Sequence, residues 1–148
     1  MADARFFNNA GPFSLAQLAS IAEAEIVSGN HEAIIDDVQP LQTAAAGQIS
    51  FLDNKLYVDA FETSAAGACL CDPKYIERAP EGMALLVTTE PYRAYARVAQ
   101  AFYPPIAAVG NIHPSSQVSD TASLGAGCQV DAGAVISDCA EIGAGCRI

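Results

Sequence analysis

The sequence predicts an α/β domain, a small mixed sheet with flanking helices, followed by the start of a parallel β-helix built from hexapeptide repeats. Over roughly the first hundred residues, short apolar strands alternate with amphipathic helical segments, a pattern typical of a sheet covered by helices. From Ile112 onward a branched apolar residue returns every six positions. No aromatic residue follows Tyr103, and Gly, Ala and Ser dominate after Pro104-Pro105. We therefore place a boundary within 107–111, which gives domains 1–108 and 109–148.

The expected elements of the first domain follow from local signals. Ser14 begins a helix, because Gln17 stands three residues later at capping-box spacing. A short helix is expected at 54–63. Thr89-Glu90-Pro91 provides an N-cap and a first-turn proline for a helix that ends at Pro104. Strands are expected at 34–38, 48–52, 67–71 and 83–87.

The hexapeptide repeat predicts its own stacking register. Its branched apolar positions are Ile112, Val118, Leu124, Val130, Ile136, Ile142 and Ile148. Three six-residue units make one triangular coil, so residues eighteen apart should stack about 4.8 Å from each other. Only two coils are present, whereas a stable stack needs about three or more repeats and a cap. Since the pattern stops at Ile148, we expect the sequence to be part of a longer protein.

Composition narrows the functional class. The net charge of −10 argues against nucleic-acid binding, which requires basic patches. No apolar run reaches the roughly 18–20 residues that span a bilayer, and no secretory leader is evident. Five cysteines then favour reduced thiols in the cytoplasm, and we interpret all five as small buried hydrophobic residues. No motif predicts a cofactor or a metal site.

The best candidate for a binding site is a segment between a strand and a helix. Phe51 and Tyr57 can sandwich a flat ring, since aromatic stacking adds about 0.5–1.5 kcal/mol to area burial. Asn54 has both a donor and an acceptor and can pair with the amide edge of a uracil, with Lys55 near a phosphate. The alternative is structural, with Phe51 in the strand core and Tyr57 packing against the helix.

The two histidines are poorly placed for catalysis. His31 follows Gly29-Asn30 in an expected turn, and His113 precedes Pro114 at the first repeat. For both we expect solvent exposure or a packing role, and no catalytic residue is assigned.

The order of these features resembles one enzyme family. The segment Ile49–Tyr57 is followed by Ala66–Leu70, by a helix with Pro91–Arg97 and by Asn111–Ser116 at the entry to the hexapeptides. This order is similar to the N-terminal part of UDP-3-O-(3-hydroxyacyl)glucosamine N-acyltransferase, an enzyme of lipid A biosynthesis. The resemblance implies a uridine-recognition domain in which Phe51, Asn54 and Tyr57 contact the uracil of a UDP-sugar lipid precursor. It also implies a left-handed β-helix that assembles as a homotrimer.

The resemblance further implies the reaction. A 3-hydroxyacyl chain passes from an acyl carrier protein to the 2-amine of the sugar, with a histidine as general base on a later coil. Neither His31 nor His113 matches that position. Because the carrier protein is strongly acidic, its docking surface should be basic, and we expect it outside this acidic sequence. Two alternatives remain: another hexapeptide acyl- or nucleotidyltransferase, and a non-catalytic hexapeptide-repeat scaffold module.

Overall fold

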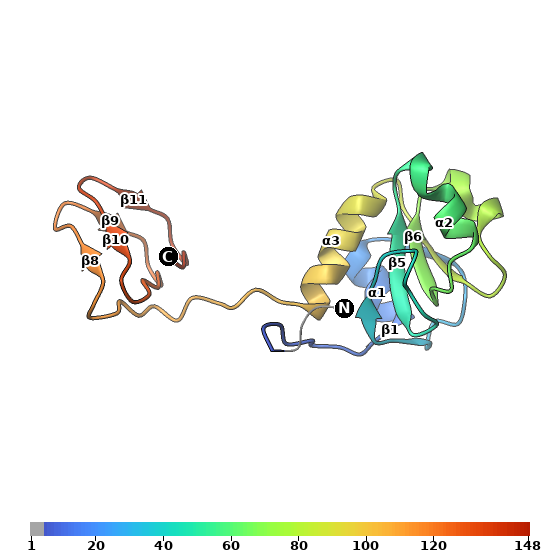
Figure 1. Cartoon of the computed structure of the whole chain (residues 1–148), viewed down its shortest axis with the longest axis horizontal. Helices are drawn as coiled ribbons and strands as arrows, with labels where there is room; N and C mark the ends of the chain where they lie inside the picture. Colours follow the sequence, from blue (N-terminus) through green and yellow to red (C-terminus); the bar gives the residue numbers. More distant parts are fainter. Residues whose placement is uncertain (1–4) are drawn as a thin grey trace. The chain divides into compact units, whose positions relative to one another are not determined.

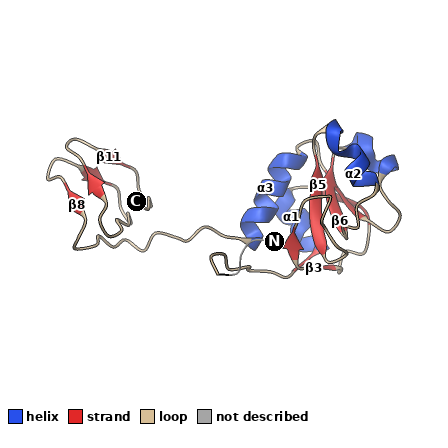
Figure 2. Cartoon of the chain, in the orientation of Figure 1, coloured by secondary structure: helices blue, strands red, loops and turns tan. Residues whose placement is uncertain are grey.

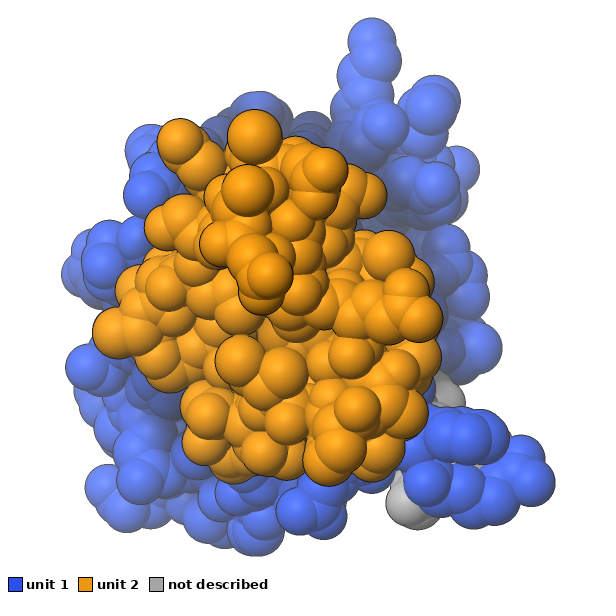
Figure 3. Space-filling view, turned by 90° about the vertical axis from the view of Figure 1, so that its left-hand side faces the viewer, with its two compact units in different colours: residues 1–104 blue, residues 105–148 orange. Residues whose placement is uncertain are grey.

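The computed structural model describes residues 5–148, which divide into two compact units (Figure 1). The first unit ends at Pro104 and the second begins at Pro105, slightly before the predicted boundary after Ala108 (Figure 3). None of the helices among the described residues combines the length and the apolar character needed to cross a membrane. The two units are described separately below.

A five-stranded sheet organises the first unit. Its strands in spatial order are β2 (Glu25–Ser28), β7 (Ala84–Val87), β6 (Ala68–Cys71), β5 (Gln48–Leu52) and β4 (Asp37–Val38). Only β2 runs antiparallel to its neighbour, and the other pairings are parallel. All four residues of β6 are buried, because helical layers cover both faces of the central parallel strands.

The helices lie on both faces of this sheet (Figure 2). One core combines α1 (Leu15–Ala22) and α3 (Pro91–Phe102) with residues such as Ile49 and Leu70. The opposite core combines α2 (Val58–Glu62) with Leu52 and Cys69. Successive residues of a strand point to opposite faces, so the alternation along β5 divides its side chains between the two cores. Two 3-10 helices, η1 (Lys55–Tyr57) and η2 (Pro73–Arg78), complete the second layer.

Local signals predicted most of these elements correctly. The Ser14 hydroxyl accepts from the Gln17 backbone N–H at 3.2 Å, and the Gln17 side chain accepts from the Ser14 N–H at 2.8 Å. This reciprocal pair confirms the capping box. β5 covers the predicted range 48–52. α3 begins at Pro91 as predicted but ends at Phe102, before the predicted end at Pro104.

Three expectations need correction. The single strand predicted at 34–38 is two strands: β3 (Ile34–Ile35) pairs antiparallel with β1 (Phe13–Ser14), whereas β4 joins the main sheet. The helix predicted at 54–63 begins as the 3-10 helix η1 before α2. β2 was not predicted, because only its pairing with β7 stabilises this largely exposed segment.

The second unit consists of stacked short strands. β8 (Gln117–Val118) pairs in parallel with β10 (Val135–Ile136), and β9 (Ser123–Leu124) pairs in parallel with β11 (Glu141–Ile142). An isolated parallel bridge joins Ile112 to Val130. Each pairing joins residues eighteen apart, which confirms the register predicted from the repeat.

The cysteines differ from expectation at one position. Four are buried or partly buried, namely Cys69, Cys71, Cys128 and Cys146, but Cys139 is exposed. Cys139 also has φ 58°, in the left-handed region, and it stands at the turn between β10 and β11. The prediction of five buried cysteines was therefore wrong for Cys139.

Candidate functional site

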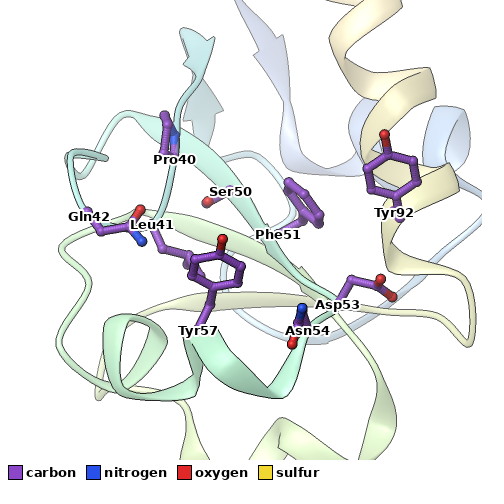
Figure 4. A pocket seen from close by; sticks show the side chains of 9 residues that line it. All are labelled: Pro40, Leu41, Gln42, Ser50, Phe51, Asp53, Asn54, Tyr57 and Tyr92. Atoms are coloured by element: carbon purple, nitrogen blue, oxygen red, sulfur yellow. The ribbon is translucent and has the colours of Figure 1, made fainter.

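A pocket of about 500 Å³ lies beside β5 in the first unit (Figure 4). Its wall combines the loop after β4, the end of β5, the turn into η1 and the start of α3. Three of the four predicted site residues, Phe51, Asn54 and Tyr57, are on this wall, but Lys55 is not. The full set of lining residues is Pro40, Leu41, Gln42, Ser50, Phe51, Asp53, Asn54, Tyr57 and Tyr92.

The pocket exists because β4 is shorter than β5. The Gln39 N–H donates to the Ile49 carbonyl at 3.0 Å, one residue beyond the end of β4. Pro40 follows, and its missing N–H cannot continue the ladder. β5 runs on to Leu52, so beyond Ile49 it has no partner strand on the β4 side, and Ser50 and Phe51 border the pocket.

Phe51 is held in place from the side of α3. Its ring stacks on Tyr95, with centroids 4.3 Å apart and planes 25° apart. Tyr92 meets the same ring edge-on at 5.8 Å and 61°. Because Tyr95 covers one face of the ring, the opposite face remains available to the pocket. Burial, and then the nearby Asp37 charge, raise the pKa of Tyr95, which keeps this tyrosine neutral.

The sequence interpretation missed both tyrosines of α3. Tyr92 and Tyr95 stand one helical turn apart, a spacing that places them on the same side of the helix. That spacing was visible in the sequence. Their approach to Phe51 depends on the packing of α3 against β5, for which the sequence contained no signal.

Asn54 organises the turn into η1. Its Oδ1 accepts from the Leu56 backbone N–H at 3.0 Å, and its carbonyl accepts from the Tyr57 N–H at 3.0 Å. With Oδ1 engaged in this cap, the amide nitrogen lies on the side of Tyr57 and Phe51 (Figure 4). The amide nitrogen of Asn54 is thus free of this cap, whereas its oxygen already accepts one hydrogen bond. Tyr57 is 50% exposed at the mouth of the pocket.

The pocket wall carries little charge. Asp53 is the single residue of the wall with a formal charge at neutral pH, and the wall includes neither lysine nor arginine. A phosphate inside the pocket would therefore meet a carboxylate and no cation. Aromatic faces combined with amide and hydroxyl groups instead suit a flat, neutral group with a polar edge.

The remaining candidate groups lie elsewhere. His31 and His113 are both exposed, and neither belongs to the pocket wall. The Nδ1 atom of His113 accepts from the Ser115 backbone N–H at 3.1 Å, within its own turn. Among residues 5–148, no three His, Cys, Asp or Glu side chains gather in a way that would hold a metal ion.

The fold and the pocket define a small α/β domain with a pocket beside its sheet, followed in sequence by stacked six-residue repeats. Residues 32–101, which include all nine residues of the pocket wall, match the family model of UDP-3-O-(3-hydroxymyristoyl) glucosamine N-acyltransferase, LpxD. Over this region the chain is therefore similar in sequence to this family of N-acyltransferases.

Individual relatives extend the similarity over most of the chain. A UDP-3-O-acylglucosamine N-acyltransferase of Parvibaculum lavamentivorans is 44% identical over 122 residues, which cover 77% of this chain and 35% of the relative. The corresponding protein of Granulibacter bethesdensis is 40% identical, over 86% of this chain and 37% of the relative. UDP-3-O-acylglucosamine N-acyltransferase 2 of Legionella pneumophila strain Paris is 36% identical, over 90% of this chain and 39% of the relative. The chain thus spans 35–39% of the length of these relatives.

Proposed function

We propose that this chain provides the UDP-sugar recognition of a UDP-3-O-acylglucosamine N-acyltransferase that acts in lipid A synthesis. The observation that supports this most strongly is the aromatic pocket, whose wall has a single charged residue and lies entirely inside the region matched by the family model. In the proposed complex the uracil stacks between Phe51 and Tyr57.

The geometry of the pocket gives each residue a specific role in this proposal. Tyr95 holds the Phe51 ring from behind, so that Phe51 presents a fixed face and little conformational freedom is lost on binding. Tyr57 closes over the base from the opposite side. Asn54 donates from its amide nitrogen to a carbonyl oxygen of uracil, because its own oxygen is engaged with Leu56.

The charged part of the ligand lies outside the pocket in this proposal. Asp53 on the wall disfavours a phosphate there. Lys55 is exposed on η1, next to Asn54, and a diphosphate that leaves the pocket on this side can reach it. The glucosamine and its acyl chain continue beyond the diphosphate.

We infer a wider role for the whole protein on the same basis. The parallel coils of the second unit begin a left-handed β-helix that assembles as a homotrimer in the cytoplasm. The enzyme transfers a 3-hydroxyacyl chain from an acyl carrier protein to the 2-amine of the UDP-sugar. His31 and His113 are exposed and neither is among the residues of the pocket wall, and the general base for this transfer is not assigned to either of them.

Titration calorimetry with UDP and UDP-N-acetylglucosamine tests the nucleotide site. We expect Phe51→Ala and Tyr57→Ala each to weaken binding at least about tenfold, since each removes one stacking face and its buried area. Leu56→Ala is the matched control, because Leu56 lies between the site residues in sequence, is 78% exposed and is not on the pocket wall. Absence of binding by the unaltered chain, or equal losses in all three variants, would contradict the proposal.

A further inference from the structure

Ser50 has a buried hydroxyl with no hydrogen-bond partner. The residue is 1% exposed, and its Oγ is the only buried side-chain nitrogen or oxygen without a partner among residues 5–148. Such a group costs free energy in the folded protein, because it has lost its hydrogen bonds to water without gaining others. Ser50 is also part of the pocket wall. Figure 4 shows its oxygen turned away from Phe51, toward the side of the pocket where Gln42 and Tyr57 lie.

The backbone beside Ser50 adds polar groups to the same edge. The Gln48 carbonyl accepts from Gly67 on the β6 side, and the Ile49 carbonyl accepts from Gln39 on the β4 side. Backbone groups alternate between the two sides along a strand. The N–H and C=O of Phe51 therefore face the same side as those of Ile49, where β4 has already ended. The edge of β5 thus combines one hydroxyl, one N–H and one C=O.

The chemistry of this edge selects the class of ligand atom. A hydroxyl can donate or accept, and the adjacent backbone can do both, which complements a planar group that alternates carbonyl oxygens with an N–H. A phosphate fits less well, since it brings negative charge next to Asp53 and finds no lysine or arginine on the wall. A nucleobase edge satisfies the hydroxyl while its faces contact the aromatic rings.

We propose that Ser50 is a base-recognition residue of this pocket, whose hydroxyl forms a hydrogen bond with the polar edge of the bound uracil beside the Phe51 backbone. This inference rests on the proposed nucleotide site and adds to it a residue outside the aromatic sandwich. Binding then satisfies a group that is unsatisfied in the free protein. Removal of the hydroxyl should weaken binding and at the same time stabilise the ligand-free chain.

The experiment compares the unaltered chain with Ser50→Ala, using UMP and UDP as probes and calorimetry as the readout. We expect the Kd for both nucleotides to rise about tenfold, by the same factor, because they share the base. The thermal midpoint of the ligand-free variant should rise. Ser28→Ala is the matched control, because the Ser28 hydroxyl donates to the Met83 carbonyl at 3.2 Å and is not on the pocket wall. That control should keep the Kd unchanged and lower the midpoint.

The outcomes separate this inference from the proposed function. If Phe51→Ala weakens binding but Ser50→Ala does not, the nucleotide site stands and the role of Ser50 is refuted. A loss for UDP without a loss for UMP would place Ser50 at the β-phosphate, the group that UMP lacks, and overturn its assignment to the base. If the unaltered chain binds neither nucleotide, both proposals fail.

A second variant covers the case in which Ser50→Ala misfolds. Ser50→Cys keeps a side chain of similar shape with a much weaker donor. The Kd of Ser50→Cys should be higher than that of the unaltered chain, but by less than about tenfold. An unchanged Kd would refute the hydrogen bond.

Discussion

The hydrogen bond between Tyr103 and Asp37 predicts a specific loss of stability in Tyr103→Phe. The Tyr103 hydroxyl donates to the Asp37 carboxylate at 2.6 Å, which joins the end of α3 to β4, and Asp37 is only 7% exposed. The substitution removes one oxygen and keeps the ring, including its edge-on contact with Phe7 at 6.2 Å. The expected cost is therefore mainly that of the hydrogen bond to Asp37.

The magnitude follows from the charge of the acceptor. Hydrogen bonds to charged groups contribute about 1.5–3 kcal/mol, and the partial exposure of Tyr103 favours the lower end of that range. Asp37 retains a second hydrogen bond, from the Val38 N–H at 2.8 Å, so its carboxylate is not left without a partner. We expect the free energy of unfolding to fall by about 1.5 kcal/mol, which lowers the urea midpoint by about 1 M for a domain of this size.

The same bond predicts a dependence on alkaline pH. Burial, and then the hydrogen bond to Asp37, raise the pKa of Tyr103 to about 12, above the ordinary value of about 10. A group whose pKa is raised by folding stabilises the protein fully below its unfolded pKa, and this stabilisation is lost as the pH rises through the folded pKa. The difference in unfolding free energy between the unaltered chain and Tyr103→Phe should thus be constant below about pH 10 and shrink toward about pH 12.

Urea unfolding followed by near-ultraviolet circular dichroism measures both effects in the first unit, since every aromatic residue precedes Pro104. Tyr75→Phe is the matched control, because Tyr75 is 8% exposed and its hydroxyl forms no hydrogen bond within the described residues. The reasoning is refuted if the two variants lose equal stability, or if the difference for Tyr103→Phe persists unchanged up to pH 12.

Two further predictions concern packing. Gly67→Ala should cost about 3 kcal/mol or more in urea unfolding, because a Cβ there would lie 1.8 Å from the Ala46 carbonyl oxygen; an unchanged midpoint would show that the backbone adapts without cost. In thiol titration at about pH 8, Cys139 should react rapidly because it is exposed. Cys69 and Cys71 should react only on unfolding, because both are buried. Burial raises the pKa of both thiols, that of Cys71 to about 11. Rapid reaction of all the cysteines in the folded chain would contradict this accessibility.

The sequence supported correct predictions wherever the determining contacts are local or periodic. The Ser14 capping box lies within four residues, and the β5 segment reads as one short apolar strand. The repeat is periodic, and a period of six allowed the pairing of Ile112 with Val130 to be predicted without any knowledge of long-range contacts.

Predictions failed where distant segments determine the structure. The run 34–38 was predicted as one strand, yet β3 and β4 pair with different partners, because β1 lies beside the first half and β5 beside the second. The miss at Cys139 has a different cause. Cys139 holds the turn position of the repeat, where Gly127, Gly133 and Gly145 also have positive φ, and the period of six could have identified that position.

For the candidate site, the sequence by itself determined that Phe51, Asn54 and Tyr57 fall within one strand–turn–helix segment, because that arrangement depends on neighbours in the chain. Tertiary structure decided that β4 ends early enough to open a pocket beside β5, and that α3 brings Tyr95 behind the Phe51 ring. It also decided that the Ser50 hydroxyl is buried at that pocket without a partner. Burial and hydrogen-bond satisfaction depend on every segment that packs nearby, so they emerge only when the sheet and its helices are assembled.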